Sequence, residues 1–222
     1  MFKTIFCKLI MLVLLMNGGV VWGANLVKNG NFEGGGSEWT EWSSPQPWVN
    51  DVFEHDYAHG SDIWTPEPYP YDGEHTHSQK KGVNNIHGGL YQVINVTKGK
   101  RYTLSGLWSG GIGGLVPASN TIAAWYEVTI YDGAASVAQI DAGAGANDVT
   151  IAKRTHDGTS VYNFGWETFS GTFTAKSSQI TLALKTGKLG DWEAIAAYHD
   201  NISLYEFFNW PMFMPAMTRE KE

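Results

Sequence analysis

Alternation of apolar and polar residues is the main pattern in this chain, and it becomes regular from Gly88 onward. Side chains of a β-strand point alternately to its two faces, so a period of two residues predicts strands that are apolar on one side. The alternating stretches are residues 88–108, 122–131, 165–187 and 194–205. A further short strand is expected at residues 137–140, after the turn predicted at Asp132-Gly133. We expect no helix longer than a turn or two, so the pattern predicts an all-β fold.

Parity within each stretch separates an inward face from an outward face. The side chains expected in the core are those of Tyr102, Leu104, Tyr126, Val128, Ile130, Phe169, Phe173, Leu182, Leu184, Ile202 and Leu204. Strands with one apolar face each bury those faces by packing in two layers, which predicts an antiparallel jelly-roll β-sandwich. Trp108 has the inward parity unless Gly106 forms a bulge, and the sequence leaves both open. Trp125, Glu127 and Thr129 have the outward parity, which places them on a solvated face or on a ligand platform.

Residues 34–85 alternate less and are rich in aromatic residues, histidine and proline. Strands are expected in two places, at residues 48–53 and 74–79. The stretch TPEPYPYD at residues 65–72 predicts an extended surface loop, because proline cannot donate a hydrogen bond within a sheet. A loop this long in a compact domain is often functional.

Two motifs near the ends of this region carry a family resemblance. Residues 25–33 have the sequence NLVKNGNFE, in which Asn29-Gly30 predicts a tight turn, and residues 196–206 have the sequence AAYHDNISLYE. With the hairpin pattern QVINVTKGKRYTL at residues 92–104, they resemble the galactose-binding-like β-sandwich of carbohydrate-binding modules, of the family 4 and 9 type. The resemblance covers residues 24–206. It implies that the two motifs lie near each other in a jelly-roll sandwich that binds a glycan.

The resemblance also implies a structural calcium ion. In these modules, carboxylates at the two motif positions commonly help to bind Ca²⁺, and here those positions are Glu33 and Asp200. Ca²⁺ takes roughly six to eight oxygen ligands, so carbonyl groups near Asn31 and in the turn at residues 73–75 would have to complete the coordination. The alternative is that the two acids cap turns or pair with Lys28.

The first 23 residues predict a secretory signal peptide. Lys3 and Lys8 precede an apolar run at residues 9–16, and this run is too short to cross a bilayer. The predicted location is therefore extracellular. Cys7, the one cysteine of the chain, would leave with this leader, which excludes a disulfide framework, a zinc-thiolate site and a cysteine nucleophile. The apolar, proline-broken tail at residues 207–222 has three open explanations: packing on the sandwich, a linker, or disorder.

Removal of the leader also shifts the charge balance. Two of the 15 basic residues would leave with it, so 13 remain against 22 acidic ones, a net charge of −9. This acidic balance argues against nucleic acid and anionic membrane surfaces as partners, and neutral glycans or bound cations fit better.

Ten tryptophans supply candidates for a sugar site. Sugar rings stack their C–H faces on indole rings, and polar groups at the rim bind the hydroxyls. The candidate ligand-binding residues are Trp42, Trp48, Trp64, Trp125, Glu127 and Trp192. For any one tryptophan the simpler explanation is that it covers an end of the sandwich. His75 and His77 share a strand face with the spacing of metal sites, but two ligands do not make a site, and exposed loop histidines are the commoner explanation.

Three functions follow from these features. The best supported is a secreted, non-catalytic β-sandwich that is stabilised by Ca²⁺ and binds a neutral polysaccharide or oligosaccharide through aromatic stacking. The second is a structural or adhesive matrix protein of the same fold without a sugar site. The third is a jelly-roll polysaccharide lyase or hydrolase, although no spacing of carboxylates singles out an acid and base pair.

Overall fold

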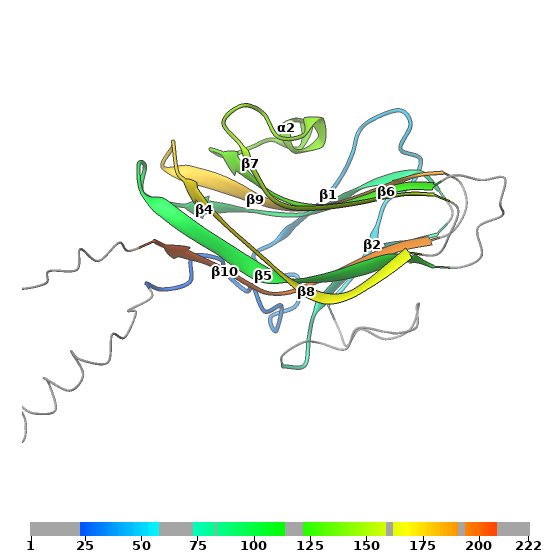
Figure 1. Ribbon diagram of the computed structural model, residues 1–222, viewed down its shortest axis with the longest axis horizontal. Coiled ribbons are helices and arrows are strands. Elements are labelled where there is room, and N and C mark those ends of the chain that lie inside the picture. The colour runs from blue at the N-terminus through cyan, green and yellow to red at the C-terminus, as the bar shows by residue number, and fades with distance from the viewer. Residues whose placement is uncertain are drawn as a thin grey trace, which may run out of the picture.

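A computed structural model describes residues 23–57, 73–82, 84–113, 122–158, 162–190 and 194–207. Within these residues, ten strands form two antiparallel five-stranded sheets that face each other as two layers (Figure 1). Sheet I contains, in order across the sheet, β1 (Thr40–Ser43), β4 (Ile86–Asn95), β9 (Gln179–Leu189), β6 (Ile122–Asp132) and β7 (Val149–Gly158). Sheet II contains β2 (Glu54–Asp56), β3 (His77–Lys81), β10 (Ala194–Glu206), β5 (Arg101–Gly113) and β8 (Tyr162–Thr174). From β3 to β10 the chain passes to the other sheet after every strand except β6, which is followed by β7 in the same sheet. Such alternation between two sheets is typical of a jelly roll. The predicted antiparallel β-sandwich is confirmed.

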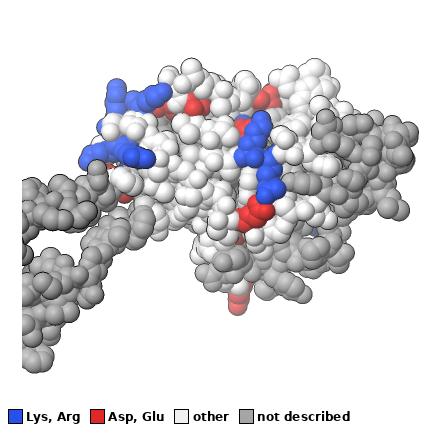
Figure 2. Space-filling view, viewed as in Figure 1, with Lys and Arg blue, Asp and Glu red and all other residues white. Residues whose placement is uncertain are grey.

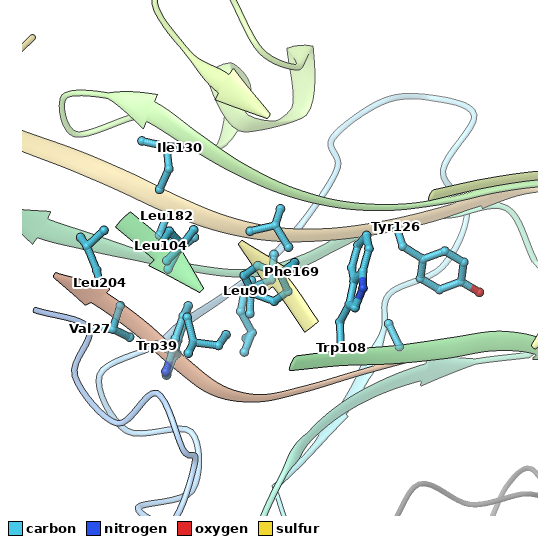
Figure 3. Close-up of a cluster of buried hydrophobic side chains, with 14 of the residues drawn as sticks. Val27, Trp39, Leu90, Leu104, Trp108, Tyr126, Ile130, Phe169, Leu182 and Leu204 are labelled. Carbon is cyan, nitrogen blue, oxygen red and sulfur yellow. The ribbon is translucent and has the colours of Figure 1, made fainter. Parts of the chain in front are cut away.

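The core lies between the two sheets (Figure 3). All eleven side chains assigned to it by parity are buried there. Trp108 also points inward, with its ring centroid 5.9 Å from that of Phe169. A Cβ atom on Gly106 would lie 2.5 Å from the Phe169 ring, so this glycine makes room for the phenylalanine. The irregularity in the pairing of β5 with β8 falls after Trp108, between Trp108 and Gly110.

A short helix replaces the strand predicted at residues 137–140. Helix α2 (Val137–Ala142) begins at a capping box, in which Ser136 and Gln139 satisfy each other's backbone N–H groups. The S-x-x-Q spacing was the signal for this helix, and alternation over four residues was too short to outweigh it. The helix buries Ile140 on the outward face of sheet I (Figure 1). There it forms a satellite hydrophobic cluster with Trp42, Tyr131, Ala135 and Ala183.

The short strands of the N-terminal half differ from prediction. Residues 48–53 form no strand, and β2 follows them; β3 overlaps the strand predicted at residues 74–79. Neither β1 nor β7 was expected. A strand of three or four residues, such as β1 or β2, is too short to show a period, so its partner decides its conformation. β7 is ten residues long, but residues 153–157 are all polar and show no apolar face. The loop predicted at residues 65–72 lies outside the described residues, as do residues 1–22 and 208–222. In the described part of the chain, no helix is long and apolar enough to cross a membrane.

The two family motifs are adjacent in the structure. Leu26 N donates to Leu204 O at 2.9 Å, and Ile202 N donates to Gly30 O at 2.8 Å. The Asn25 side chain joins the same two segments, because its amide nitrogen donates to Ile202 O and its oxygen accepts from Leu204 N. A Cβ atom on Gly30 would lie 2.0 Å from Ile202 O, so only glycine permits this approach.

Candidate functional site

The outward face of sheet I carries a row of side chains that cross-strand pairing brings together. His87 of β4 is paired with Gly187 of β9, Gly187 with Trp125 of β6, and Trp125 with Thr155 of β7. A Cβ atom on Gly187 would lie only 2.1 Å from the Trp125 ring. The indole therefore lies over the bare backbone of Gly187. One face of the ring rests on the sheet, and the ring remains partly exposed.

The connection between β1 and β2 folds over this row and brings Trp48 to it. The Trp48 ring is nearly parallel to the His87 ring, at 16° and 6.1 Å between centroids. Both rings stand at 63° to Trp125, with centroids 6.3 Å and 5.4 Å from its own. Trp48 is 36% exposed, whereas His87 is buried. We call this set the aromatic corner: Trp125 is its floor, and His87 with Trp48 is its wall.

The next row of the same face holds a buried ion pair. Lys185 of β9 contacts the carboxylate of Glu127 of β6 and donates to the Tyr131 hydroxyl at 2.8 Å. The other oxygen of Glu127 lies 3.3 Å from Lys153, and Thr129 donates to the carboxylate at 2.6 Å. Burial by itself raises the pKa of Glu127, but the hydrogen bonds from Lys185 and Thr129 and the charges of both lysines hold it below its usual value. Glu127 is therefore ionised and compensated at neutral pH.

A second polar contact ties the aromatic corner to helix α2. His87 Nδ1 lies 3.1 Å from Asp141, and the Gln46 amide donates to the same carboxylate at 2.8 Å. Burial lowers the pKa of His87 although Asp141 opposes this shift, so the imidazole is neutral at pH 7. Burial raises the pKa of Asp141, but hydrogen bonds from Ser44 and Gln46 outweigh it and lower the pKa.

Some of the predicted ligand-binding residues lie together in the structure, and others do not. Trp48 and Trp125 meet in the aromatic corner. Trp42 does not offer a face to a ligand, because it is 4% exposed within the satellite cluster. Glu127 lies on the predicted face but is only 8% exposed and is bound by lysines, so its role as a rim group stays a prediction. Trp64 and Trp192 lie outside the described residues.

His87 is the residue of the corner that sequence reasoning missed. Its position depends on the register of β4 with β9, which the sequence does not state. The sequence offered one signal: His87 has the same outward parity as Tyr91 and is followed by two glycines, Gly88 and Gly89.

The acids proposed as calcium ligands lie on segments that touch. Glu33 Oε1 accepts from the backbone N–H groups of Glu74 and His75, at 2.8 and 3.0 Å. The Thr76 hydroxyl, in the same turn, donates to His199 O at 2.8 Å, next to the fully buried Asp200. Glu33 therefore caps this turn, and Asp200 accepts from Asn201 N at 2.7 Å, which is the alternative expected for these two acids. Asn31 is exposed and lines a shallow polar depression of about 450 Å³.

Three histidines meet inside the sandwich, and they are not the pair expected from the sequence. His77 Nε2 lies 3.1 Å from His55 Nδ1, and His77 Nδ1 lies 3.1 Å from His199 Nδ1. We call them the histidine chain. Both ring nitrogens of His77 contact a neighbouring histidine. The three rings therefore form a hydrogen-bonded chain and do not converge on one point as metal ligands would. Among the described residues, no group of three or more His, Cys, Asp or Glu is placed to hold a metal ion.

Comparison with known proteins finds solved structures of similar architecture. No family model matches the chain, and no curated protein matches it. Several of the similar solved structures are carbohydrate-binding modules. TmCBM61 in complex with β-1,4-galactotriose is 15% identical over 83% of this chain and 100% of that one, with a TM-score of 0.46. The C-terminal family 22 module of Clostridium thermocellum Xyn10B is 15% identical over 83% and 96%, with a TM-score of 0.44.

A domain of another kind is similar to the same extent. The enzymatically active domain of bacteriophage CBA120 tailspike protein 4 is 13% identical over 82% of this chain and 21% of that one, with a TM-score of 0.44. Similarity at this level says nothing of a ligand. The sandwich itself is established by the strand pairing of this chain.

Proposed function

We propose that this protein is a secreted, non-catalytic β-sandwich that binds a neutral glycan at the aromatic corner. The observation that carries the proposal is the fold-over of Trp48, which gives a partly exposed indole wall beside a partly exposed indole floor. Two indole surfaces at one exposed place supply the apolar contact on which a sugar ring stacks. Secretion is part of the proposal and rests on the leader pattern of residues 1–23.

The charges around the corner favour a neutral ligand. Glu127 is compensated by Lys185 and Lys153, and Asp141 is held by His87 and Gln46. A charged ligand would therefore find no uncompensated partner among these groups. On the edge of the sandwich seen in Figure 2, the Lys and Arg side chains form separate groups, and the central group has acidic side chains next to it.

The same contacts support binding rather than cleavage. Glycoside hydrolysis requires two carboxyl groups that flank the scissile bond. Two carboxylates beside the corner are buried in contacts of their own: the side chains of Glu127 and Asp141 are 9% and 3% exposed. A glycan array with product analysis tests this part. Binding without product is expected, and release of shorter products would overturn the non-catalytic assignment.

Replacing the floor of the corner should weaken glycan binding. Trp125→Ala removes the stacking surface, and loss of a binding hot spot of this kind costs about 1–2 kcal/mol, or about tenfold in Kd. Calorimetric titration of array-positive soluble oligosaccharides against the two proteins measures this change. Unchanged affinity in a folded Trp125→Ala protein would move the site elsewhere.

A structural Ca²⁺ at Glu33 and Asp200 is the second part of the proposal. An ion that binds only the folded state stabilises it by about 2.7 kcal/mol at a hundredfold excess over Kd. Chelator should therefore lower the Tm of the wild type, added Ca²⁺ should restore it, and Asp200→Ala should respond to neither. Scanning calorimetry with and without chelator makes the measurement. A wild type indifferent to both additions would remove the ion from the proposal.

A further inference from the structure

The geometry of the aromatic corner points to a single stacking subsite: we infer that the protein binds one pyranose residue of a soluble glycan, and that further residues of the chain add little affinity. This inference rests on the proposed glycan-binding function and specifies its ligand. It concerns how many sugar residues are bound, which the proposed function leaves open.

The angle between the rings is the first argument. A flat glycan ribbon or a crystalline surface stacks its successive residues on rings that lie nearly in one plane. Here the wall stands at 63° to the floor, with the Trp48 and Trp125 centroids 6.3 Å apart. A sugar ring that lies flat on Trp125 therefore meets Trp48 at its edge. The next residue of a chain cannot continue over Trp48 in the same plane.

The wall cannot turn flat, because both of its rings are held. His87 is 7% exposed, contacts Asp141 at 3.1 Å and meets the edge of the buried Trp42 at 79°. Trp48 is stacked on His87. The connection that carries Trp48 is fixed by a backbone hydrogen bond from Asn50 N to Asn85 O, at 3.2 Å.

The side of the floor opposite the wall has no second stacking ring among the described residues. On β7, the residue paired with Trp125 is Thr155, and Lys153 lies two residues before it on the same strand. Both side chains are exposed. A sugar residue above them would exchange hydrogen bonds with water for hydrogen bonds with these groups, and such exchange contributes little net free energy. Among the residues that the structure describes, the stacking contribution is thus confined to the one sugar residue on Trp125.

A chain-length series tests the inference. Neutral gluco-, galacto-, manno- and xylo-oligosaccharides of one to six residues are titrated against the wild type by calorimetry. In the series that binds, Kd should change less than about threefold between two and six residues. A Kd that falls tenfold or more with each of several added residues would overturn the single subsite. Absence of binding in every series would instead overturn the proposed function.

Gly187→Ala supplies a variant that alters the corner without removing any ring. Its Cβ would lie 2.1 Å from the Trp125 indole, so the floor must shift. Affinity should fall at least tenfold for every oligosaccharide length alike. Trp48→Leu, at an exposed position, is the second variant in case Gly187→Ala does not fold, and the same uniform loss is expected. Val93→Ala, an exposed position on β4 outside the corner, is the control and should bind like the wild type. Loss confined to the long oligosaccharides, or depletion of the wild type by crystalline cellulose, would contradict the inference.

Discussion

Lowering the pH from 7 to 5 is expected to remove about 4 kcal/mol from the free energy of unfolding through two members of the histidine chain, His77 and His199. Each is fully neutral in the fold at both pH values, while its unfolded form takes up a proton below the ordinary histidine pKa of about 6.5. Over this interval one such histidine contributes about 2 kcal/mol. Urea unfolding at the two pH values, followed by fluorescence, measures the difference.

The sign follows from the direction of the pKa shifts. Burial lowers the pKa of His77 far below its ordinary value, and the neighbouring His199 and His55 lower it further. Burial, with His55, lowers the pKa of His199 to about 3. Burial also lowers the pKa of His55, although the charge of Glu41 opposes this. The folded state therefore binds fewer protons than the unfolded chain. Above about pH 6.5 the shifts cost little stability, and below it the free energy of unfolding falls because only the unfolded chain takes up protons.

His77→Gln is the matched control for this prediction. A glutamine amide can donate to one ring and accept from the other, as the neutral imidazole does, but it does not titrate. The variant should lose about 1.4 kcal/mol less per pH unit than the wild type below pH 6. Equal stability of the wild type at pH 5 and pH 7 would show that the histidine chain is accessible to protons in the folded state.

Lys185→Met is expected to lower the free energy of unfolding by about 3 kcal/mol, because it leaves the Glu127 carboxylate buried without its main partner. Lys185 is 3% exposed, and its ammonium group contacts both Glu127 and the Tyr131 hydroxyl. Lys153 remains near the carboxylate, but its side chain is 54% exposed and screened by solvent, so it compensates little. Chemical unfolding at pH 7 gives the value.

The double variant Lys185→Met with Glu127→Gln separates charge from packing. Removal of both charges leaves no uncompensated ion, so most of the stability should return. A double variant as unstable as the single one would place the loss in the methylene packing of Lys185. These variants also test the placement of Glu127, since a free rim carboxylate would affect affinity without affecting stability.

The fold could be predicted from the sequence where strands are long. Parity over β6 identified Tyr126, Val128 and Ile130 as core residues, because ten alternating positions leave one consistent choice of face. It failed for the short strands β1 and β2, and the short α2 was taken for a strand; the ten-residue β7 was missed because residues 153–157 are all polar and show no apolar face. Short elements derive their conformation from partners and caps, so their own residues carry too little pattern.

Only part of the candidate site could be predicted from the sequence in this way. The outward placement of Trp125 followed from parity, whereas the position of Trp48 beside it depends on how the connection between β1 and β2 folds over the sheet. The contributions of His87 and Gly187 depend on strand register, which links residues 100 positions apart. The burial of Trp42 depends on α2, an element that was misassigned.

The pairing of the first and last segments determines how the sandwich responds to tension. Residues 25–30 run antiparallel to residues 202–204, and their outer ends lie on the same side of the molecule (Figure 1). A pull between residues 25 and 206 therefore loads these hydrogen bonds one after another, as in a zipper, and not all together in shear. Detachment of this segment would displace Glu33 from the turn that wraps it while the two sheets are still paired. Stretching would thus weaken the proposed ion site before it disturbs the aromatic corner.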